Sequence, residues 1–357
     1  MLGKKRVYIS DVHMGAGREP SGNHFSYDWL DLDEARIFAD FLHHLIDDPE
    51  VGEIVLLGDT MDNWVCPIYE EPPTFHEIIN SPLNAEIVKN LKSLAENTEK
   101  RLIYMPGNHD MLITKNILEK YFPGIVFGGS AAYKSVYRTS RLRAEHGSSY
   151  AMFNAPDAIN NPGNRLPLGY FISRVAATKH AQTGSAERHF WTYADDLLEL
   201  LGPEKLPSSV FEAVTEEAEI GADQEIRLSG SASIKVGEVK ARYSDLYEQW
   251  KTHYGKGFAF KAVMAEIGYL DDFADMLCKK GDTNIVIFGH SHESDLDKDT
   301  WFVEDRVYAN CGSWCDAKED CTFVETQKDD EERIHHVRLN RWKNGAVEII
   351  DETSVNL

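Results

Sequence analysis

The chain has 357 residues, enough for one large α/β domain or two domains of ordinary size. With 42% hydrophobic and 27% charged residues, it has the composition of a globular protein rather than a disordered one. The net charge of −22 argues against a general surface for nucleic acid or anionic membranes, because both require a basic footprint. A small anionic substrate stays possible, since bound divalent metals can dominate the local field.

The same composition bears on the cellular compartment. No apolar run approaches the roughly 20 residues that a transmembrane helix needs, so we expect no transmembrane segment. The first residues, MLGKKRVYISD, have a basic start but no apolar signal region. Five irregularly spaced cysteines indicate the reducing cytoplasm rather than a disulfide framework. Cys311, Cys315 and Cys321 match no zinc template, and we interpret them as small buried hydrophobic residues.

Five β-prone runs each end in a polar segment that contains Asp, Asn or His. In chain order, residues 6–10 precede Asp11-Val12-His13, residues 53–57 precede Gly58-Asp59, residues 101–105 precede Pro106-Gly107-Asn108-His109-Asp110, residues 142–145 precede His146-Gly147, and residues 284–288 precede Gly289-His290-Ser291-His292. Ligand sites in open α/β sheets lie at the carboxyl ends of strands. Because helical patterns at 33–46 and 83–95 separate the first strands, we predict an α/β fold with all five segments at one edge.

A long segment separates the last two of these runs. Helical patterns at 193–201, 208–220, 244–253 and 259–277 predict a largely helical insertion, a cap or side lobe, over residues 148–281. This insertion would lie within a single domain that spans residues 1–357. After His292, short alternating segments separated by turn residues predict a β-rich C-terminal layer.

Each polar segment is weak evidence alone and stronger in combination. Asp11 and His13 could form a solvated turn, and Asp59 could cap a helix. By contrast, His290 and His292 have a spacing that can serve two neighbouring metals. Together the segments supply carboxylate, amide and imidazole donors suited to a pair of divalent ions. The predicted metal ligands are Asp11, His13, Asp59, Asn108, His146, His290 and His292.

The ordered set D-x-H, G-D-x-x-D, G-N-H-D, H-G and G-H-x-H resembles the calcineurin-like metallophosphoesterase superfamily. The resemblance covers residues 6–292, except the insertion, and continues in Asn310-Cys311-Gly312-Ser313-Trp314, which is similar to an N-x-G-S-W segment of many members. It implies a four-layer β-sandwich flanked by helices. It also implies that the whole chain is one catalytic domain.

The resemblance further implies a role for each residue. Asp11, His13 and His292 would bind the first metal, and Asn108, His146 and His290 the second, with Asp59 as the bridge. The two ions would activate a shared water, and the resulting hydroxide would attack phosphorus. The catalytic pair would be His109, which protonates or stabilises the leaving group, and Asp62, which orients it.

Departures from the family pattern bear on the substrate. Phosphoprotein phosphatases of the superfamily carry Arg where this chain has Asn63, so that alternative is disfavoured. The sequence G-D-x-x-D-x-W is similar to the bacterial branch of UDP-diacylglucosamine pyrophosphatase-like enzymes. That branch often has Arg at the position of His109 and an acid at that of Ser148. The substrate therefore cannot be transferred from that branch.

The insertion holds three groups of side chains with two interpretations each. A basic island at 164–190, which includes Arg165 and Arg174, could clamp a substrate phosphate together with Asn63, or could be a solvated helix face that pairs with acids. The acidic run at 195–225 is better explained as a solvated surface than as a partner site. Phe153, Tyr170, Phe171, Phe190, Trp191 and Tyr193 could bind a leaving group, but an insertion core is favoured.

The sequence thus predicts a metal-dependent phosphoesterase that acts on a small phosphorylated or nucleotide-like molecule. The cofactors would be two divalent ions, drawn from Mn, Fe, Zn and Ni, with Mn favoured. A catalytically silent metal-binding scaffold is the non-enzymatic alternative, although no ligand is missing. The sequence specifies no oligomeric state.

Overall fold

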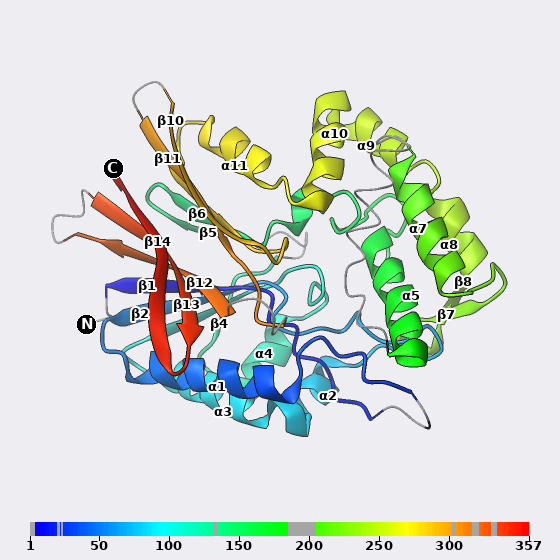
Figure 1. The fold of residues 1–357 in the computed structure, drawn as a ribbon, viewed down its shortest axis with the longest axis horizontal. Coiled ribbons are helices and arrows are strands. Elements are labelled where there is room, and N and C mark those ends of the chain that lie inside the picture. Colours follow the sequence, from blue (N-terminus) through cyan, green and yellow to red (C-terminus); the bar gives the residue numbers. More distant parts are fainter. Residues whose placement is uncertain are drawn as a thin grey trace.

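Two facing β-sheets form the centre of the molecule in the computed structural model (Figure 1). The structure describes residues 4–19, 22, 24–130, 135–184, 205–301, 304–315, 321–329 and 334–356. In the larger sheet the order is β14-β13-β12-β1-β2-β3-β4, and in the smaller one it is β10-β11-β9-β6-β5. The larger sheet comprises β1 (Lys5–Ile9), β2 (Val51–Leu57), β3 (Arg101–Met105), β4 (Val126–Phe127), β12 (Cys321–Lys328), β13 (Ile334–Lys343) and β14 (Ala346–Asn356). The smaller sheet comprises β5 (Tyr137–Thr139), β6 (Leu142–Ala144), β9 (Ile285–Phe288), β10 (Ser294–Trp301) and β11 (Glu304–Cys311).

The parallel strands at the centre of both sheets are buried on two faces. Strands β1, β2 and β3 pair in parallel, as do β6, β9 and β11. Along β2, Ile54 and Leu56 pack against helices, whereas Val55 and Leu57 face the second sheet, as the two-residue period of a strand requires. This double burial explains why these strands are continuous apolar runs in the sequence.

Helices cover the outer faces and complete four layers. The helices α1 (Leu32–Asp47) and α3 (Ala85–Glu96) lie together on the larger sheet, where α1 contributes Phe38 and Phe41 to the core. The shorter helices α2 (Phe75–Asn80) and α4 (Lys115–Tyr121) flank them. Val286 and Phe288 of β9 join a separate cluster with the helices of the insertion. The α/β sandwich expected from the sequence is therefore confirmed, as is its β-rich C-terminal layer.

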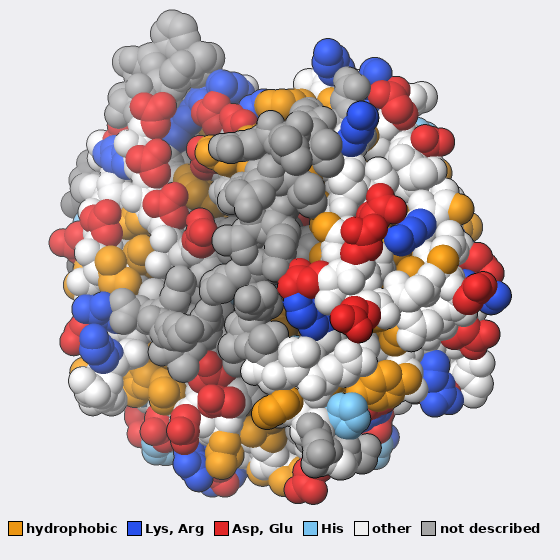
Figure 2. Space-filling view, turned by 45° about the vertical axis from the view of Figure 1, so that its right-hand side comes forward, with side chains coloured by type: hydrophobic (Ala, Val, Ile, Leu, Met, Phe, Trp, Pro, Cys, Tyr) orange, Lys and Arg blue, Asp and Glu red, His pale blue; other side chains and the backbone are white. Residues whose placement is uncertain are grey.

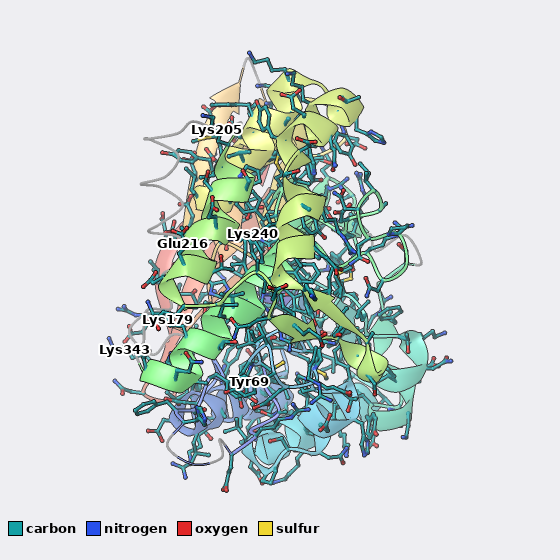
Figure 3. All side chains as sticks on the ribbon, turned by 90° about the vertical axis from the view of Figure 1, so that its right-hand side faces the viewer. Tyr69, Lys179, Lys205, Glu216, Lys240 and Lys343 are labelled. Carbon is teal, nitrogen blue, oxygen red and sulfur yellow. The ribbon has the colours of Figure 1, made fainter. Side chains whose placement is uncertain are left out.

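The described part of the segment 148–281 is mostly helical. Its helices are α5 (Leu168–Thr183), α7 (Leu206–Glu217), α8 (Val236–Tyr243), α9 (Leu246–Tyr254), α10 (Lys256–Met264) and α11 (Asp271–Cys278), with a hairpin of β7 (Glu225–Arg227) and β8 (Ser233–Lys235). Of these, α5 and α7–α10 lie to the right of the sheets in Figure 1, whereas α11 lies against β9 and β11 of the smaller sheet. Helices α5, α7 and α8 lie side by side, and the labelled Lys179, Glu216 and Lys240 mark their outer surface (Figure 3). The domain boundaries themselves stay a prediction.

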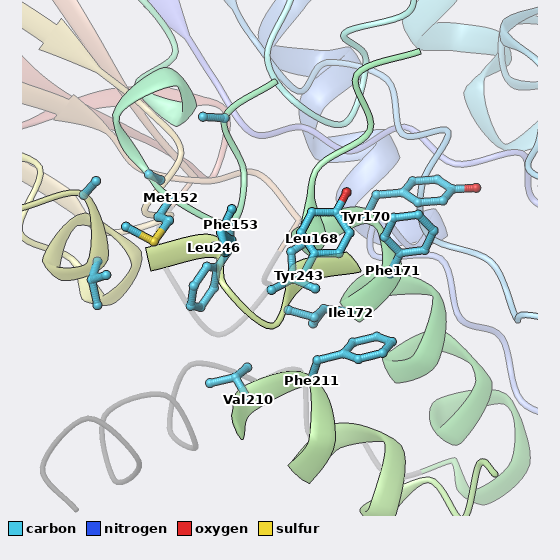
Figure 4. Packing of buried hydrophobic residues seen from close by; sticks show 14 of the residues in the cluster. Met152, Phe153, Leu168, Tyr170, Phe171, Ile172, Val210, Phe211, Tyr243 and Leu246 are labelled. Atoms are coloured by element: carbon cyan, nitrogen blue, oxygen red, sulfur yellow. The ribbon is translucent and has the colours of Figure 1, made fainter. Parts of the chain in front are cut away.

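The aromatic residues of this segment form its core. Phe153, Tyr170 and Phe171 are buried and pack with Phe211 and Tyr243 (Figure 4). The interpretation of these residues as core is therefore confirmed. Phe190, Trp191 and Tyr193 lie outside the described residues, as does the helix expected at 193–201.

Two expectations were wrong in detail. The helix expected at 259–277 is broken, because Gly268, with φ of +100°, separates α10 from α11. The five polar segments do not share the edge of one sheet either. Those after β1, β2 and β3 come from the larger sheet and those after β6 and β9 from the smaller, because the strands divide between two stacked sheets.

The surface bears on two further expectations. Among the described helices, none has the length and apolarity to cross a membrane. On the face drawn in Figure 2, acidic and basic side chains are interspersed among the coloured residues, with no continuous basic patch in view. The expected lack of a nucleic-acid surface stays a prediction.

Candidate metal centre

Strained backbone conformations mark the polar segments that follow the strands. Of the nine described non-glycine residues with positive φ, five are predicted metal ligands: Asp11, His13, Asp59, His290 and His292. Such a conformation is costly for residues with a side chain and persists where surrounding contacts enforce it. Here the backbone N–H groups of Val12 and His13 donate hydrogen bonds to Asp59 O, at 3.0 and 2.8 Å. These hydrogen bonds connect two of the polar segments.

Two glycines let the polar segments pack closely, because neither position carries a side chain. A side chain at Gly107 would collide with Asp59, and one at Gly289 would collide with Ser10 and Asp11. Only glycine therefore lets the third and fifth segments approach the first two. His109 N donates to Asp59 Oδ1 at 2.8 Å, and His290 N donates to Asp11 Oδ2 at 2.9 Å. These backbone hydrogen bonds also fix the orientation of both carboxylates.

Three predicted ligands of the first metal converge on one point. His13 Nε2 lies 3.1 Å from His292 Nε2, and Asp11 Oδ1 lies 3.3 Å from His292 Nε2 and 3.8 Å from His13 Nε2. Asp11 is fully buried, and its Oδ1 accepts no hydrogen bond of normal geometry among the described residues. A buried, unpaired oxygen beside two facing imidazole nitrogens fits a divalent cation.

The predicted ligands of the second metal gather beside the first group. His146 Nε2 lies 3.0 Å from both Asn108 Oδ1 and Asp59 Oδ2, and His290 has a donor atom within 4.8 Å of those of Asp59 and His146. Asp59 Oδ2 is also 3.9 Å from His13 Nε2, so Asp59 stands between the two groups. All seven predicted ligands are therefore brought together.

The pKa values of the predicted ligands are shifted in different directions. Burial lowers the pKa of His290 to about 3, aided by the charge of His146. Burial also opposes the charge on His146 and His292, yet Asp59 and Asp11 raise the pKa of His146 to about 9, and Cys315 and Asp11 raise that of His292 to about 10. The imidazoles compensate for the burial of Asp11, and its pKa is held well below the usual range. A divalent ion would take the place of the protons that balance these buried carboxylates.

Asp62 contacts two histidines at once. Its Oδ2 lies 2.9 Å from His13 Nδ1 and 2.9 Å from His109 Nδ1, and its Oδ1 accepts from the backbone N–H groups of Trp64 and Val65. Despite burial, the charge of His109 and both imidazole hydrogen bonds hold the pKa of Asp62 far below its usual range. The contact expected between Asp62 and His109 is thus present, and Asp62 also orients a predicted metal ligand.

Asp110 serves the backbone rather than the metal. It is fully buried, and it accepts hydrogen bonds from Gly107 N, Thr60 N and the Tyr104 hydroxyl at 2.7, 3.1 and 2.5 Å. Burial and the nearby charge of Asp59 raise the pKa of Asp110 to about 7. The last residue of the G-N-H-D segment therefore fixes the turns that carry Asp59 and Asn108.

The N-x-G-S-W segment packs against two of the polar segments. Trp314 N donates to Asp11 O at 3.0 Å, and Asn310 Nδ2 donates to Gly289 O at 3.0 Å. The segment follows β11, which pairs with β9. It therefore fixes the first and the last segments relative to each other.

The structure corrects the interpretation of the basic island. Arg174 is fully buried, and its five N–H groups make five hydrogen bonds, to Cys66 O, Pro67 O, Glu70 O, Arg227 O and the Tyr170 hydroxyl. No N–H group is left to clamp a phosphate. Lys179 forms an ion pair with Glu217, as expected for a solvated helix face. Arg188 lies outside the described residues.

The other two predicted substrate contacts lie in more suitable places. Asn63 is buried, and its backbone N donates to His109 O at 3.3 Å. The side-chain Oδ1 of Asn63 has no partner among the described residues. Arg165 lines a cavity of about 400 Å³, together with Glu145, Ser149 and Trp250. The described residues that line this cavity include none of the seven predicted ligands; Glu145 and Ser149 flank His146-Gly147 in the chain.

Sequence reasoning missed residues that support the centre from a distance. Asn154 Oδ1 accepts from Asn108 Nδ2 at 3.3 Å, and Glu266 Oε2 accepts from Asn154 Nδ2 at 2.8 Å. The ring of Trp29 lies 4.5 Å from that of His13 and 5.2 Å from that of His109, between centroids. These residues belong to no motif, and only the fold brings them here.

Comparison with solved structures finds distant similarities with low TM-scores. Among solved structures, GAP50 of Plasmodium has a TM-score of 0.41 and 14% identity, covering 99% of this chain and 88% of that chain. Vps29 from Cryptosporidium parvum has a TM-score of 0.35 and 10% identity over all of both chains. Vps29 from Entamoeba histolytica, complexed with Zn²⁺, has a TM-score of 0.33 and 11% identity over 99% of both chains. No curated protein sequence matches the chain.

The sequence profile of one family matches most of the chain. The profile, described as calcineurin-like phosphoesterase, matches residues 5–294, a range that holds all seven predicted ligands. The resemblance of the five polar segments is therefore confirmed. The chain belongs to the calcineurin-like phosphoesterase family.

Proposed function

We propose that the protein hydrolyses phosphate esters or diesters at a dinuclear metal centre. The observation that supports this most is the convergence of seven donor residues from five strand ends, beside a buried Asp62–His109 pair. Asp11, His13 and His292 would hold one ion, Asn108, His146 and His290 the other, and Asp59 both. When bound, the two ions would polarise the phosphoryl group and acidify a water.

The residues of this chain would contribute position and a proton. His109 Nδ1 faces Asp62, so its Nε2 is left to donate a proton to the leaving oxygen. The ring of Trp64 lies 4.5 Å from that of His109, with an angle of 30° between the planes, and limits its rotation. Such orientation favours one tautomer and one direction for the proton.

We use the cavity that Arg165 lines to propose the kind of substrate. Aromatic and aliphatic residues line most of it, including Tyr243, Trp250 and Phe258, and Arg165 adds a positive charge. We propose a small phosphorylated molecule with an apolar or aromatic part, such as a nucleotide-like one. Asn63, whose backbone N donates to His109 O and whose Oδ1 has no partner among the described residues, is proposed as a phosphate contact.

A silent scaffold and a protein phosphatase are the alternatives. A protein phosphatase is disfavoured by Asn63, and a silent scaffold by the presence of every ligand and of the Asp62–His109 pair. Mn²⁺, Fe²⁺, Zn²⁺ and Ni²⁺ all accept oxygen and imidazole ligands, and we propose two ions from this set, with Mn²⁺ favoured. We place the protein in the cytoplasm, because all five cysteines are free thiols.

The test measures turnover of p-nitrophenyl phosphate and bis(p-nitrophenyl) phosphate with Mn²⁺, Fe²⁺, Zn²⁺ and Ni²⁺. We expect metal-dependent turnover of at least one substrate. With phenyl phosphate, whose leaving oxygen needs a proton, His109→Ala should lower kcat roughly 100- to 10,000-fold while metal content is unchanged, since only a proton donor is lost. Arg165→Ala should raise KM more than it lowers kcat.

Two matched results decide between the alternatives. Lys115→Ala, which removes an exposed charge of α4, should leave turnover unchanged and serves as the control. A metal-loaded protein that turns over neither ester would favour the scaffold. Equal kcat with phenyl phosphate in wild type and His109→Ala would remove His109 from the mechanism.

A further inference from the structure

Cys315 lies at the first metal group rather than in a hydrophobic core. The donor atoms of Cys315, His13 and His292 all lie within 4.8 Å of one another. Cys315 is only 3% exposed, so its thiol is enclosed with these imidazoles. The sequence interpretation of Cys315 as a small buried hydrophobic residue does not account for this position.

The backbone fixes the thiol at this place. Trp314 N donates to Asp11 O at 3.0 Å, which anchors the residue before Cys315 to a predicted ligand. Cys315 N donates to Ser313 Oγ at 3.2 Å, and Ser313 Oγ lies 3.3 Å from Cys315 Sγ. Because the hydroxyl already accepts from the backbone, its proton is available to the sulfur.

The other four cysteines have different surroundings. Cys66, Cys278 and Cys311 belong to clusters of buried hydrophobic side chains, and Cys321 packs against another. Cys315 belongs to none of these clusters. Its neighbours are polar groups with nitrogen donors, the surroundings of a ligand thiol.

A second observation points to the same place. Asp11 Oδ1 is buried without a hydrogen-bond partner, and it lies 3.3 Å from His292 Nε2 and 3.8 Å from His13 Nε2. The unpartnered carboxylate and the thiol thus share the same two histidines. A cation among them would contact oxygen, nitrogen and sulfur.

We propose that Cys315 Sγ is a protein ligand of the first metal, in addition to Asp11, His13 and His292. This inference rests on the proposed dinuclear centre. Coordination forms a metal–sulfur bond and releases the thiol proton to the solvent, with no change in oxidation state. A thiolate is a soft ligand, so the first site prefers Zn²⁺ or Fe²⁺ to the harder Mn²⁺, while the second site lacks sulfur.

The test uses cobalt as a spectroscopic probe in the full chain. Metal is removed with a chelator and two equivalents of Co²⁺ are added to wild type, Cys315→Ser and Cys278→Ala. Wild type should show a sulfur-to-cobalt charge-transfer band in the near ultraviolet, and Cys315→Ser should lose it while circular dichroism shows a folded chain. Cys278→Ala, which removes a buried thiol of α11, should keep the band.

The possible results distinguish the assignment of Cys315 from the proposed dinuclear centre. Two bound Co²⁺ ions without the band in wild type, or an unchanged band in Cys315→Ser, would overturn the assignment of Cys315 but leave the proposed function standing. Wild type that binds no Co²⁺ would overturn both. If Cys315→Ser fails to fold, X-ray absorption of the zinc-loaded wild type decides, because a Zn–S distance of about 2.3 Å is expected. Only nitrogen and oxygen neighbours would contradict the proposal.

Discussion

Asp62 contacts both a proposed metal ligand and the proposed acid through one carboxyl group. Its Oδ2 stands 2.9 Å from both His13 and His109, so a single side chain orients a proposed ligand and the proposed acid. Its Oδ1 is fixed by two backbone N–H groups, which leaves the carboxylate little freedom. The position of His109, the proposed acid, is therefore tied to that of His13, a proposed ligand.

The burial of Glu266 opposes its ionisation. It is 3% exposed and accepts hydrogen bonds from Phe153 N and from Asn154 Nδ2. Burial raises its pKa from 4.5 to about 8, although those hydrogen bonds partly offset the effect. Between these two values the folded chain holds a proton that the unfolded chain has released.

The stability of the protein should therefore depend on pH through Glu266. An acid with a raised pKa stabilises the fold fully below its unfolded value, and this contribution is lost as pH rises from 4.5 to about 8. Glu266→Gln, which cannot ionise, should flatten this fall in urea-denaturation midpoints. Glu248→Gln on the exposed face of α9 is the control and should follow wild type. Parallel pH curves for wild type and Glu266→Gln would show that Glu266 does not titrate in this range.

Strands and their polar ends could be predicted because their signals are local. Double burial makes β2 and β9 continuous apolar runs, and each ends where polar residues begin. The division of these strands between two sheets could not be predicted from the runs alone. Antiparallel and parallel pairing depend on partners far away in the chain, such as β12 beside β1.

The insertion shows where local patterns fail. Arg174 has the sequence environment of a surface cation, yet its hydrogen bonds to the loop after β2 and to the β7–β8 hairpin dock α5 on the rest of the protein. Gly268 divides a helical pattern that otherwise runs on. Only tertiary packing brings Asn154, Glu266 and Cys315 to the centre, so no sequence motif identifies them.

The insertion should also tune the second metal site. Asn154 holds Asn108 by an amide hydrogen bond of 3.3 Å, so Asn154→Ala should free the proposed ligand to rotate. We expect affinity for the second metal to fall about 10- to 100-fold, as for other residues that orient metal ligands. Isothermal titration with Mn²⁺ measures both sites, and Asn160→Ala, in the loop before α5, is the control. Unchanged affinity in Asn154→Ala would show that the insertion does not position Asn108.

At the scale of the whole molecule, two stacked sheets deliver five chain segments to one place. The larger sheet supplies Asp11, His13, Asp59 and Asn108, and the smaller supplies His146, His290 and His292. In a chain of net charge −22, cations bound at this convergence would supply a large local positive charge. The centre therefore depends on the contact between the sheets as much as on any one motif.

The number of metal ions per chain tests the central claim most directly. Elemental analysis after equilibrium dialysis against Mn²⁺ or Zn²⁺ should give two ions per chain in wild type. Asp59→Ala should lose both, because the carboxylate between the two groups is removed, while Asp47→Ala on the surface of α1 should keep them. Two ions retained by Asp59→Ala, or none bound by wild type, would contradict a dinuclear centre bridged by Asp59.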